Sequence, residues 1–209
     1  MSSINDLLEL LEDAEELDQL ATARHLYEEI LVKDEADENY AATLMYIANL
    51  VDLGDLNHAE ATLARIEEEI PEDLSAAFLS QRGDLQSHRG NYAEAEKDYR
   101  EANKIDSNEG EYLVFAAQAA FQQGEVARAE YLIREAIAIG GEVLDEAYGN
   151  LAGYLVAQKR YGEAKVCYEK VVSMDSDNDH ARKWIEDLNR VLKLQAASNL
   201  CSVNDCETF

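Results

Sequence analysis

The sequence predicts an all-α fold in which about five helical hairpins stack as a solenoid. An alanine, followed four residues later by a large residue and seven residues later by a small or aliphatic one, recurs five times. Successive copies lie 34 to 36 residues apart, which is room for two helices of about 13 residues and two short turns. The 209 residues include a single proline, so long helices are not interrupted.

The recurring alanine marks one helix of each hairpin. Offsets of four and seven place three side chains on one helical face, and the alanine lets a second helix approach closely. The five sets are Ala23, Tyr27 and Ile30; Ala59, Leu63 and Ile66; Ala95, Tyr99 and Ala102; Ala129, Ile133 and Ala136; and Ala164, Tyr168 and Val171.

A glycine lies five residues before three of these alanines and predicts the turn between the two helices. Gly54, Gly90 and Gly124 can adopt positive φ without a steric penalty from a Cβ atom. The fifth copy has Lys159 at this position, and the first copy, which is the most degenerate, has Asp18.

The chain after the fifth copy predicts one more helix. Residues 179–195 carry an apolar stripe interleaved with charged residues, which is typical of a helix that caps a solenoid. Residues 196–209 have no such periodicity and are predicted to form a flexible tail.

Two segments resemble the tetratricopeptide repeat most closely. They are Gly90-Asn91-Tyr92-Ala93-Glu94-Ala95 and Tyr161-Gly162-Glu163-Ala164, where the family pattern has Gly-x-Tyr-x-x-Ala. The resemblance implies a right-handed superhelical solenoid over residues 1–195. Its repeats are expected at about 4–37, 40–73, 76–109, 110–143 and 145–178.

Composition argues against several classes of partner. The net charge of −26 repels nucleic-acid phosphates and anionic lipid headgroups. The first residues lack a basic, apolar leader, and no window approaches the roughly 18 apolar residues of a membrane span. We therefore expect a cytoplasmic protein with reduced cysteines. The ending Cys206-Glu207-Thr208-Phe209, with Cys201 upstream, is only a weak match to a lipidation signal, and an ordinary free tail is favoured.

No catalytic or metal-binding motif is apparent. His25, His58, His88 and His180 are scattered, and none lies three or four residues from another histidine or a cysteine, as ligands converging on zinc usually do. Carboxylates are abundant, but abundance alone does not identify an acid and a base. We expect neither a cofactor nor enzyme activity.

The resemblance also implies where a partner binds, because first helices of such hairpins line a concave groove. Carrying the groove positions over to this chain, with neighbouring side chains suited to the same role, selects Leu44, Met45, Ala48, Val51, Asp84, Val114, Phe115, Gln118, Phe121, Asn150 and Gly153. None is basic, so the basic clamp with which some family members hold acidic chaperone tails is missing. An apolar partner segment with basic residues is expected. Packing between hairpins is an equal alternative for Met45 and Phe115.

The first predicted helix carries an acidic patch made of Glu9, Glu12, Asp13, Glu15 and Glu16. Like charges four residues apart destabilise a helix by a few tenths of a kcal/mol per pair, as for Glu9 with Asp13. A cationic partner would relieve this repulsion, whereas solubility is an equally good explanation. The sequence thus predicts a protein-binding adaptor, scaffold or chaperone-like module. The alternative is a structural solenoid that self-associates into a homodimer and leaves the groove unused.

Overall fold

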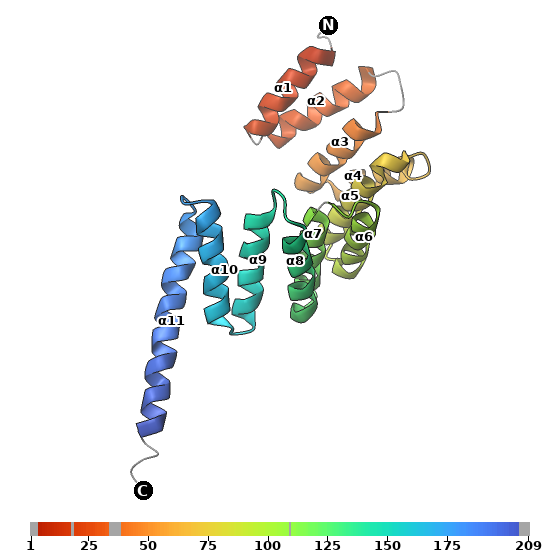
Figure 1. Ribbon diagram of the computed structural model, residues 1–209. Coiled ribbons are helices and arrows are strands. Elements are labelled where there is room, and N and C mark those ends of the chain that lie inside the picture. Colours follow the sequence, from red (N-terminus) through yellow and green to blue (C-terminus); the bar gives the residue numbers. More distant parts are fainter. Residues whose placement is uncertain (1–3, 18, 34–38, 109, 205–209) are drawn as a thin grey trace. The chain divides into compact units, whose positions relative to one another are not determined.

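The computed structural model describes residues 4–17, 19–33, 39–108 and 110–204. Within these ranges the regular structure is helical and contains no strand, which confirms the all-α prediction (Figure 1). The chain divides into two compact units, Met1–Ser107 and Asn108–Phe209, which are described separately below. The prediction of one solenoid through residues 1–195 stays a prediction.

Unit 1 contains three helical hairpins. Its helices are α1 (Ile4–Glu16), α2 (Leu20–Lys33), α3 (Tyr40–Asp52), α4 (Leu56–Ile66), the 3-10 helix η1 (Glu72–Leu74), α5 (Ser75–His88) and α6 (Tyr92–Ile105). Helices α1 and α2, α3 and α4, and α5 and α6 pack in pairs, while α3 also packs against α2 and α5. The first helices of the second and third hairpins, α3 and α5, therefore lie side by side.

Unit 2 contains two hairpins and a long final helix. Its helices are α7 (Gly110–Gln122), α8 (Val126–Ile139), α9 (Leu144–Ala157), α10 (Tyr161–Met174) and α11 (Asp179–Asn204). Helix α7 pairs with α8 and α9 with α10, and α11 packs on α10. The Trp184 ring of α11 stacks on Tyr168 of α10 at 5.7 Å between centroids, which covers the exposed side of the last hairpin.

All fifteen side chains of the recurring alanine sets are buried, as their spacing predicts. The predicted glycine turns also form, since Gly54, Gly90 and Gly124 have φ between 75° and 81°. Lys159 adopts the same conformation with φ 61° despite its Cβ atom. In each of these turns the next residue donates its backbone N–H to the carbonyl five residues earlier, as from Arg160 to Leu155 at 2.9 Å, which closes the preceding helix.

One detail differs from the expectation, and one residue departs from the pattern of the repeats. Helix α11 continues to Asn204, so much of the predicted tail at 196–209 is helical, because Ala196, Ala197 and Leu200 favour helix and neither glycine nor proline stops it. Arg82, which occupies an apolar position of its hairpin, is accommodated by a bidentate pair with Asp98 at 2.9 and 2.8 Å. Cys206 lies outside the described residues, as does the side chain of Cys201.

Candidate functional site

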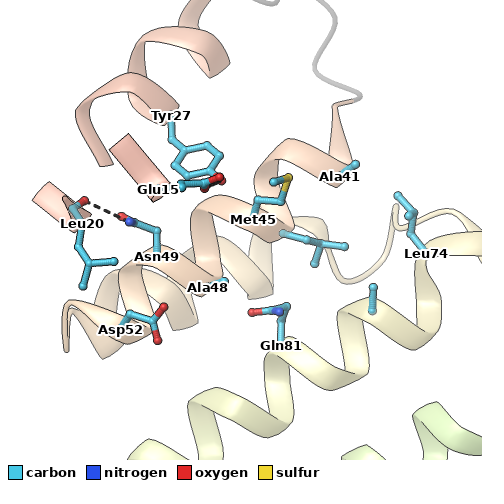
Figure 2. A pocket seen from close by; sticks show the side chains of 12 residues that line it. Glu15, Leu20, Tyr27, Ala41, Met45, Ala48, Asn49, Asp52, Leu74 and Gln81 are labelled. Carbon is cyan, nitrogen blue, oxygen red and sulfur yellow. Dashed lines mark hydrogen bonds between the residues drawn. The ribbon is translucent and has the colours of Figure 1, made fainter. Parts of the chain in front are cut away.

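Unit 1 contains a cavity of about 520 Å³ on the side of its first helices (Figure 2). Helices α1, α3 and α5 each contribute to its wall, together with α2 and η1. We call it the unit 1 cavity. Its lining residues are Glu15, Leu20, Tyr27, Ala41, Leu44, Met45, Ala48, Asn49, Asp52, Leu74, Ala77 and Gln81.

Helical periodicity places the residues of α3 that line the cavity mainly on one side of the helix and its core residues on another. Ala41, Met45, Ala48 and Asp52 are spaced by three or four residues and share one side of the helix. Met45 is 51% exposed, so most of this side chain is open to solvent and only part of it packs against other residues. The small Ala41 and Ala48 leave the space that Met45 borders.

Buried polar groups face this apolar surface. Asn49 is only 6% exposed, and its Nδ2 donates to the Leu20 carbonyl at 3.1 Å, while its Oδ1 has no hydrogen-bond partner. Gln81 Oε1 is likewise buried without a partner. The Tyr27 hydroxyl donates to Glu15 Oε1 at 2.5 Å, and burial raises the pKa of Tyr27, so this hydroxyl keeps its proton.

The fixed charges of the unit 1 cavity are negative. Glu15 and Asp52 line it, and none of its described lining residues is lysine, arginine or histidine. Asp84 of α5 does not line it, but burial raises the pKa of Asp84, and the negative charge of Asp52 adds to this rise. The Tyr99 hydroxyl, which donates to Asp84 at 2.7 Å, opposes the rise.

Unit 2 has its own cavity of about 320 Å³ between α7 and α9. We call it the unit 2 cavity, and its lining residues are Gln118, Phe121, Gln122, Gly149, Asn150, Gly153 and Tyr154. The Phe121 and Tyr154 rings stack with centroids 4.7 Å apart. Asn150 Nδ2 and the Tyr154 hydroxyl are buried without a hydrogen-bond partner, so two polar atoms here are unsatisfied.

Gly149 and Gly153 line the unit 2 cavity and have open space beside them. A Cβ atom built on either glycine would meet no atom within 4 Å, so packing inside the unit does not require glycine there. Glycine in a helix interior costs about 0.5–1 kcal/mol relative to alanine. A neighbouring cavity of about 270 Å³, which reaches α10 and α11, shares Gly149 and Asn150.

The structure groups some of the predicted groove residues and separates others. Leu44, Met45 and Ala48 meet at the unit 1 cavity, and Gln118, Phe121, Asn150 and Gly153 meet at the unit 2 cavity. In contrast, Val51 and Val114 are buried in the core, so their side chains offer no surface to a ligand. Phe115 is half-buried and lines neither cavity.

The cavity residues that escaped the groove prediction include the polar Asn49, Asp52, Gln81 and Tyr154. Asn49 gave a usable signal, because an amide within the otherwise apolar stretch from Tyr40 to Val51 needs a partner if it is buried. Gly149 and Gly153 gave a second signal, because two glycines inside a predicted helix weaken that helix.

The acidic patch is largely solvated. Glu9, Asp13, Glu15 and Glu16 are exposed on α1, which has no basic residue in its last turn, and the Glu12 side chain lies outside the described part. Of the patch residues whose side chains are described, Glu15 alone is among those that line the unit 1 cavity. The patch therefore lies beside this cavity but does not form its floor.

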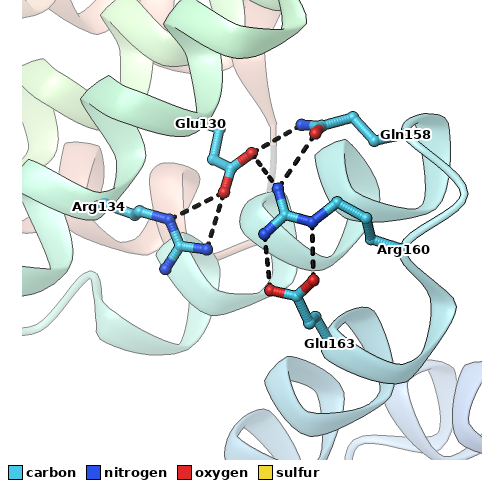
Figure 3. Close-up of polar contacts among 5 residues, drawn as sticks. All are labelled: Glu130, Arg134, Gln158, Arg160 and Glu163. Atoms are coloured by element: carbon cyan, nitrogen blue, oxygen red, sulfur yellow. Dashed lines mark hydrogen bonds and ion pairs between the residues drawn. The ribbon is translucent and has the colours of Figure 1, made fainter.

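A polar network joins the two hairpins of unit 2 (Figure 3). Glu130 of α8 accepts from Gln158 at 2.8 Å, from Arg160 at 2.6 Å and from Arg134 at 2.8 Å. Arg160 also pairs with Glu163 at 2.6 Å. Burial of Glu130 acts to raise its pKa, but the hydrogen bonds from Gln158, Arg134 and Arg160 outweigh burial and lower the pKa to about 2. This network is structural, because its charges are paired.

Among the described residues, no three histidine, cysteine or acidic side chains are grouped so that they could hold a metal ion. Over the same residues, no helix has the length and apolar character needed to cross a membrane. Burial raises the pKa of the Cys167 thiol, which leaves it a poor nucleophile.

Comparisons with known proteins identify the repeat and the fold. The family model described as "Tetratricopeptide repeat" matches residues 76–109 and 145–178. No curated protein matches the sequence.

Solved structures with similar folds share little sequence with this chain. A tetratricopeptide repeat protein from Parabacteroides merdae is 20% identical over 90% of this chain and 71% of its own, with a TM-score of 0.72. A thermophilic protein of this kind from Thermus thermophilus is 16% identical over 89% and 98%, with a TM-score of 0.73. The first such domain of Spaghetti (RPAP3), bound to the HSP90 peptide SRMEEVD, is 24% identical over 57% and 96%, with a TM-score of 0.54.

Proposed function

Because the chain is a tetratricopeptide-repeat protein, we propose that it is a non-catalytic interaction module, an adaptor or scaffold that binds a segment of another protein. Each unit offers its own binding surface on the side of its first helices, namely the unit 1 cavity and the unit 2 cavity. The partner segment is apolar and carries basic residues.

The unit 1 cavity is the observation that supports this proposal most directly. Its wall combines the apolar Leu44, Met45 and Ala48 with the carboxylates of Glu15 and Asp52. An apolar side chain from a partner would gain about 25 cal/mol per Å² of surface that it buries there. A basic side chain would be attracted by the negative charge, which also speeds association.

The peptide bound by Spaghetti suggests what this chain does not bind. SRMEEVD ends in acidic residues. The described linings of the unit 1 and unit 2 cavities contain no lysine, arginine or histidine that could pair with such a tail. Carboxylates in the unit 1 cavity would repel it. We therefore propose that acidic chaperone tails are poor ligands.

Selection from a random peptide library, with the full chain immobilised at about 0.15 M salt, tests the proposal. The enriched peptides are then titrated calorimetrically against the wild type and three glutamine variants. Ala48→Gln fills the unit 1 cavity, Gly153→Gln fills the unit 2 cavity, and Val166→Gln is a matched control at an exposed position of α10.

We expect peptides rich in apolar and basic residues, bound saturably. Ala48→Gln or Gly153→Gln should weaken binding by about tenfold or more, because truncating or blocking a central contact usually costs over 1 kcal/mol. Val166→Gln should leave binding within about twofold, because Val166 lines neither cavity. The proposal fails if no peptide is enriched, or if all three variants weaken binding alike. Circular dichroism of each variant checks that it is folded.

Self-association is the second candidate, and exposed apolar side chains of unit 1 favour it. Leu10, Leu17 and Val32 lie exposed on α1, directly after it and on α2, where a second copy could cover them. Light scattering coupled to size exclusion, over a wide range of concentrations, measures the mass. A dimer that is lost on changing Val32 to Asp supports this alternative, and a monomer at every concentration contradicts it.

A further inference from the structure

The unit 1 cavity has an excess of hydrogen-bond acceptors. Two hydrogen-bond donors of its wall are already used. The Tyr27 hydroxyl donates to Glu15, and Asn49 Nδ2 donates to the Leu20 carbonyl. Asn49 Oδ1 and Gln81 Oε1 remain without partners, and the Asp52 carboxylate can only accept. A ligand that fits this wall must bring donors.

The orientation of the Asn49 amide is fixed by its surroundings. Turning the amide over would place Oδ1 against the Leu20 carbonyl oxygen, and two acceptors repel one another. Oδ1 is therefore the atom left unsatisfied, in a side chain that is 94% buried, since it is 6% exposed. Figure 2 shows Gln81 projecting from α5 toward α3, so the second unsatisfied oxygen comes from the opposite wall.

We propose that the unit 1 cavity binds one basic side chain, lysine or arginine, of the partner segment, an inference that rests on the proposed function. The aliphatic stem packs on Leu44, Met45 and Ala77. The terminal N–H groups donate to Asn49 Oδ1 and Gln81 Oε1, and Asp52 balances the charge.

Other side chains fit this wall less well. An apolar side chain would leave Asn49 Oδ1 and Gln81 Oε1, which are already buried, without a hydrogen-bond partner. An acidic side chain would be repelled by Glu15 and Asp52. Asp84 adds to the acidic surroundings, since it lies close enough to Asp52 for that charge to raise the pKa of Asp84. A cation alone supplies both donors and the opposite charge.

Small probes test this assignment without a peptide. The full chain, with its methionine methyl groups labelled with carbon-13, is titrated by NMR with Nα-acetyl-lysine methylamide and with the arginine analogue. The uncharged norleucine and citrulline analogues are the matched controls. The chain has three methionines, so Met45 reports on the unit 1 cavity and Met174, in α10 of unit 2, serves as an internal reference.

We expect the Met45 methyl signal to shift saturably with the lysine or arginine probe while Met174 stays in place. The uncharged analogues should bind at least about tenfold more weakly, because hydrogen bonds to charged groups contribute most. Asp52→Asn should weaken the cationic probe by about threefold or more, whereas Asp73→Asn, at an exposed residue of η1, should not.

Equal binding of norleucine and lysine probes would overturn the assignment, as would shifts of Met45 that Asp52→Asn leaves unchanged. These outcomes are separate from those of the peptide selection. If peptides bind but their basic residues can be replaced by norleucine without loss, the basic-side-chain assignment fails and the proposed function stands. If the lysine probe binds but no peptide is enriched, the preference of the cavity for a basic side chain stands and the proposed function fails.

Discussion

Gly83 and Gly153 both lie inside helices, yet only one is required by packing. A Cβ atom at Gly83 would lie 2.7 Å from Cε1 of Tyr99, whose hydroxyl is held by Asp84 at 2.7 Å. At Gly153 it would meet no atom within 4 Å. We expect Gly83→Ala to destabilise the protein by about 1–3 kcal/mol through overpacking. Gly153→Ala should stabilise it by about 0.5–1 kcal/mol through helix propensity.

Urea denaturation followed by circular dichroism measures both changes in the free energy of unfolding. The two variants are controls for one another, because each adds the same methyl group to a helical glycine. Equal effects of one sign would show that local propensity, and not the neighbouring side chains, decides the outcome. The open space at Gly153 would then carry no information about a ligand.

Lys159 offers a second test at the scale of one residue. Its φ of 61° matches the turn glycines, but a side chain makes this conformation unfavourable by about 1 kcal/mol. Lys159→Gly should therefore stabilise unit 2 by up to about 1 kcal/mol. Gly124→Ala, at φ 81°, should be destabilising by a similar amount. Thermal unfolding of both variants checks the pair, and a lower midpoint for Lys159→Gly would contradict the prediction.

At the scale of helices, the α5/α6 hairpin replaces an apolar contact with an ion pair. Where Arg82 and Asp98 stand, the next hairpin has Ala116 and Leu132, and the last has Leu151 and Cys167. Arg82→Leu alone should cost about 2–4 kcal/mol, because it leaves the buried Asp98 carboxylate unpaired.

The double variant Arg82→Leu with Asp98→Leu should be close to the wild type in stability, since replacing both partners of a buried pair is often neutral. Urea denaturation of the wild type, both single variants and the double variant gives the coupling energy. Additive effects of the two substitutions would show that the pair does not stabilise the hairpin.

The network around Glu130 predicts how the contact between the α7/α8 hairpin and the α9/α10 hairpin responds to pH. Its pKa of about 2 is below the ordinary value, so its stabilising contribution is present above about pH 4.5 and is lost as the pH falls toward 2. Glu130→Gln should destabilise the protein by about 1–3 kcal/mol near neutral pH. The difference from wild type should shrink from about pH 5 to about pH 3.

Urea titrations across this range measure the difference, with Glu142→Gln, at an exposed residue after α8, as the control. A difference that stays constant with pH would mean that the charge of Glu130 is not responsible for its contribution. A similar pH dependence for Glu142→Gln would point to the overall charge of the protein.

At the scale of the whole molecule, spacing predicted the fold much better than the binding face. Positions such as Ala129 and Gly124 are constrained within one hairpin, by close helix contact and by a turn, so their signal is local. Whether Val51 or Met45 reaches solvent depends on how neighbouring hairpins cover α3, which involves residues far along the chain. The unsatisfied Asn49 Oδ1 could be recognised only once Leu20 was placed beside it.

The net charge of −26 leads to the last prediction. Repulsion among 44 acidic residues, with only 18 basic ones to offset them, destabilises any compact state. Salt screens this repulsion and also weakens ion pairs such as Arg160 with Glu163, but acidic residues outnumber basic ones by more than two to one. Raising sodium chloride from about 0.02 M to about 0.5 M should therefore raise the thermal midpoint by a few degrees. Calorimetry at both salt concentrations measures it, and a lower midpoint in high salt would show that the ion pairs outweigh the charge excess.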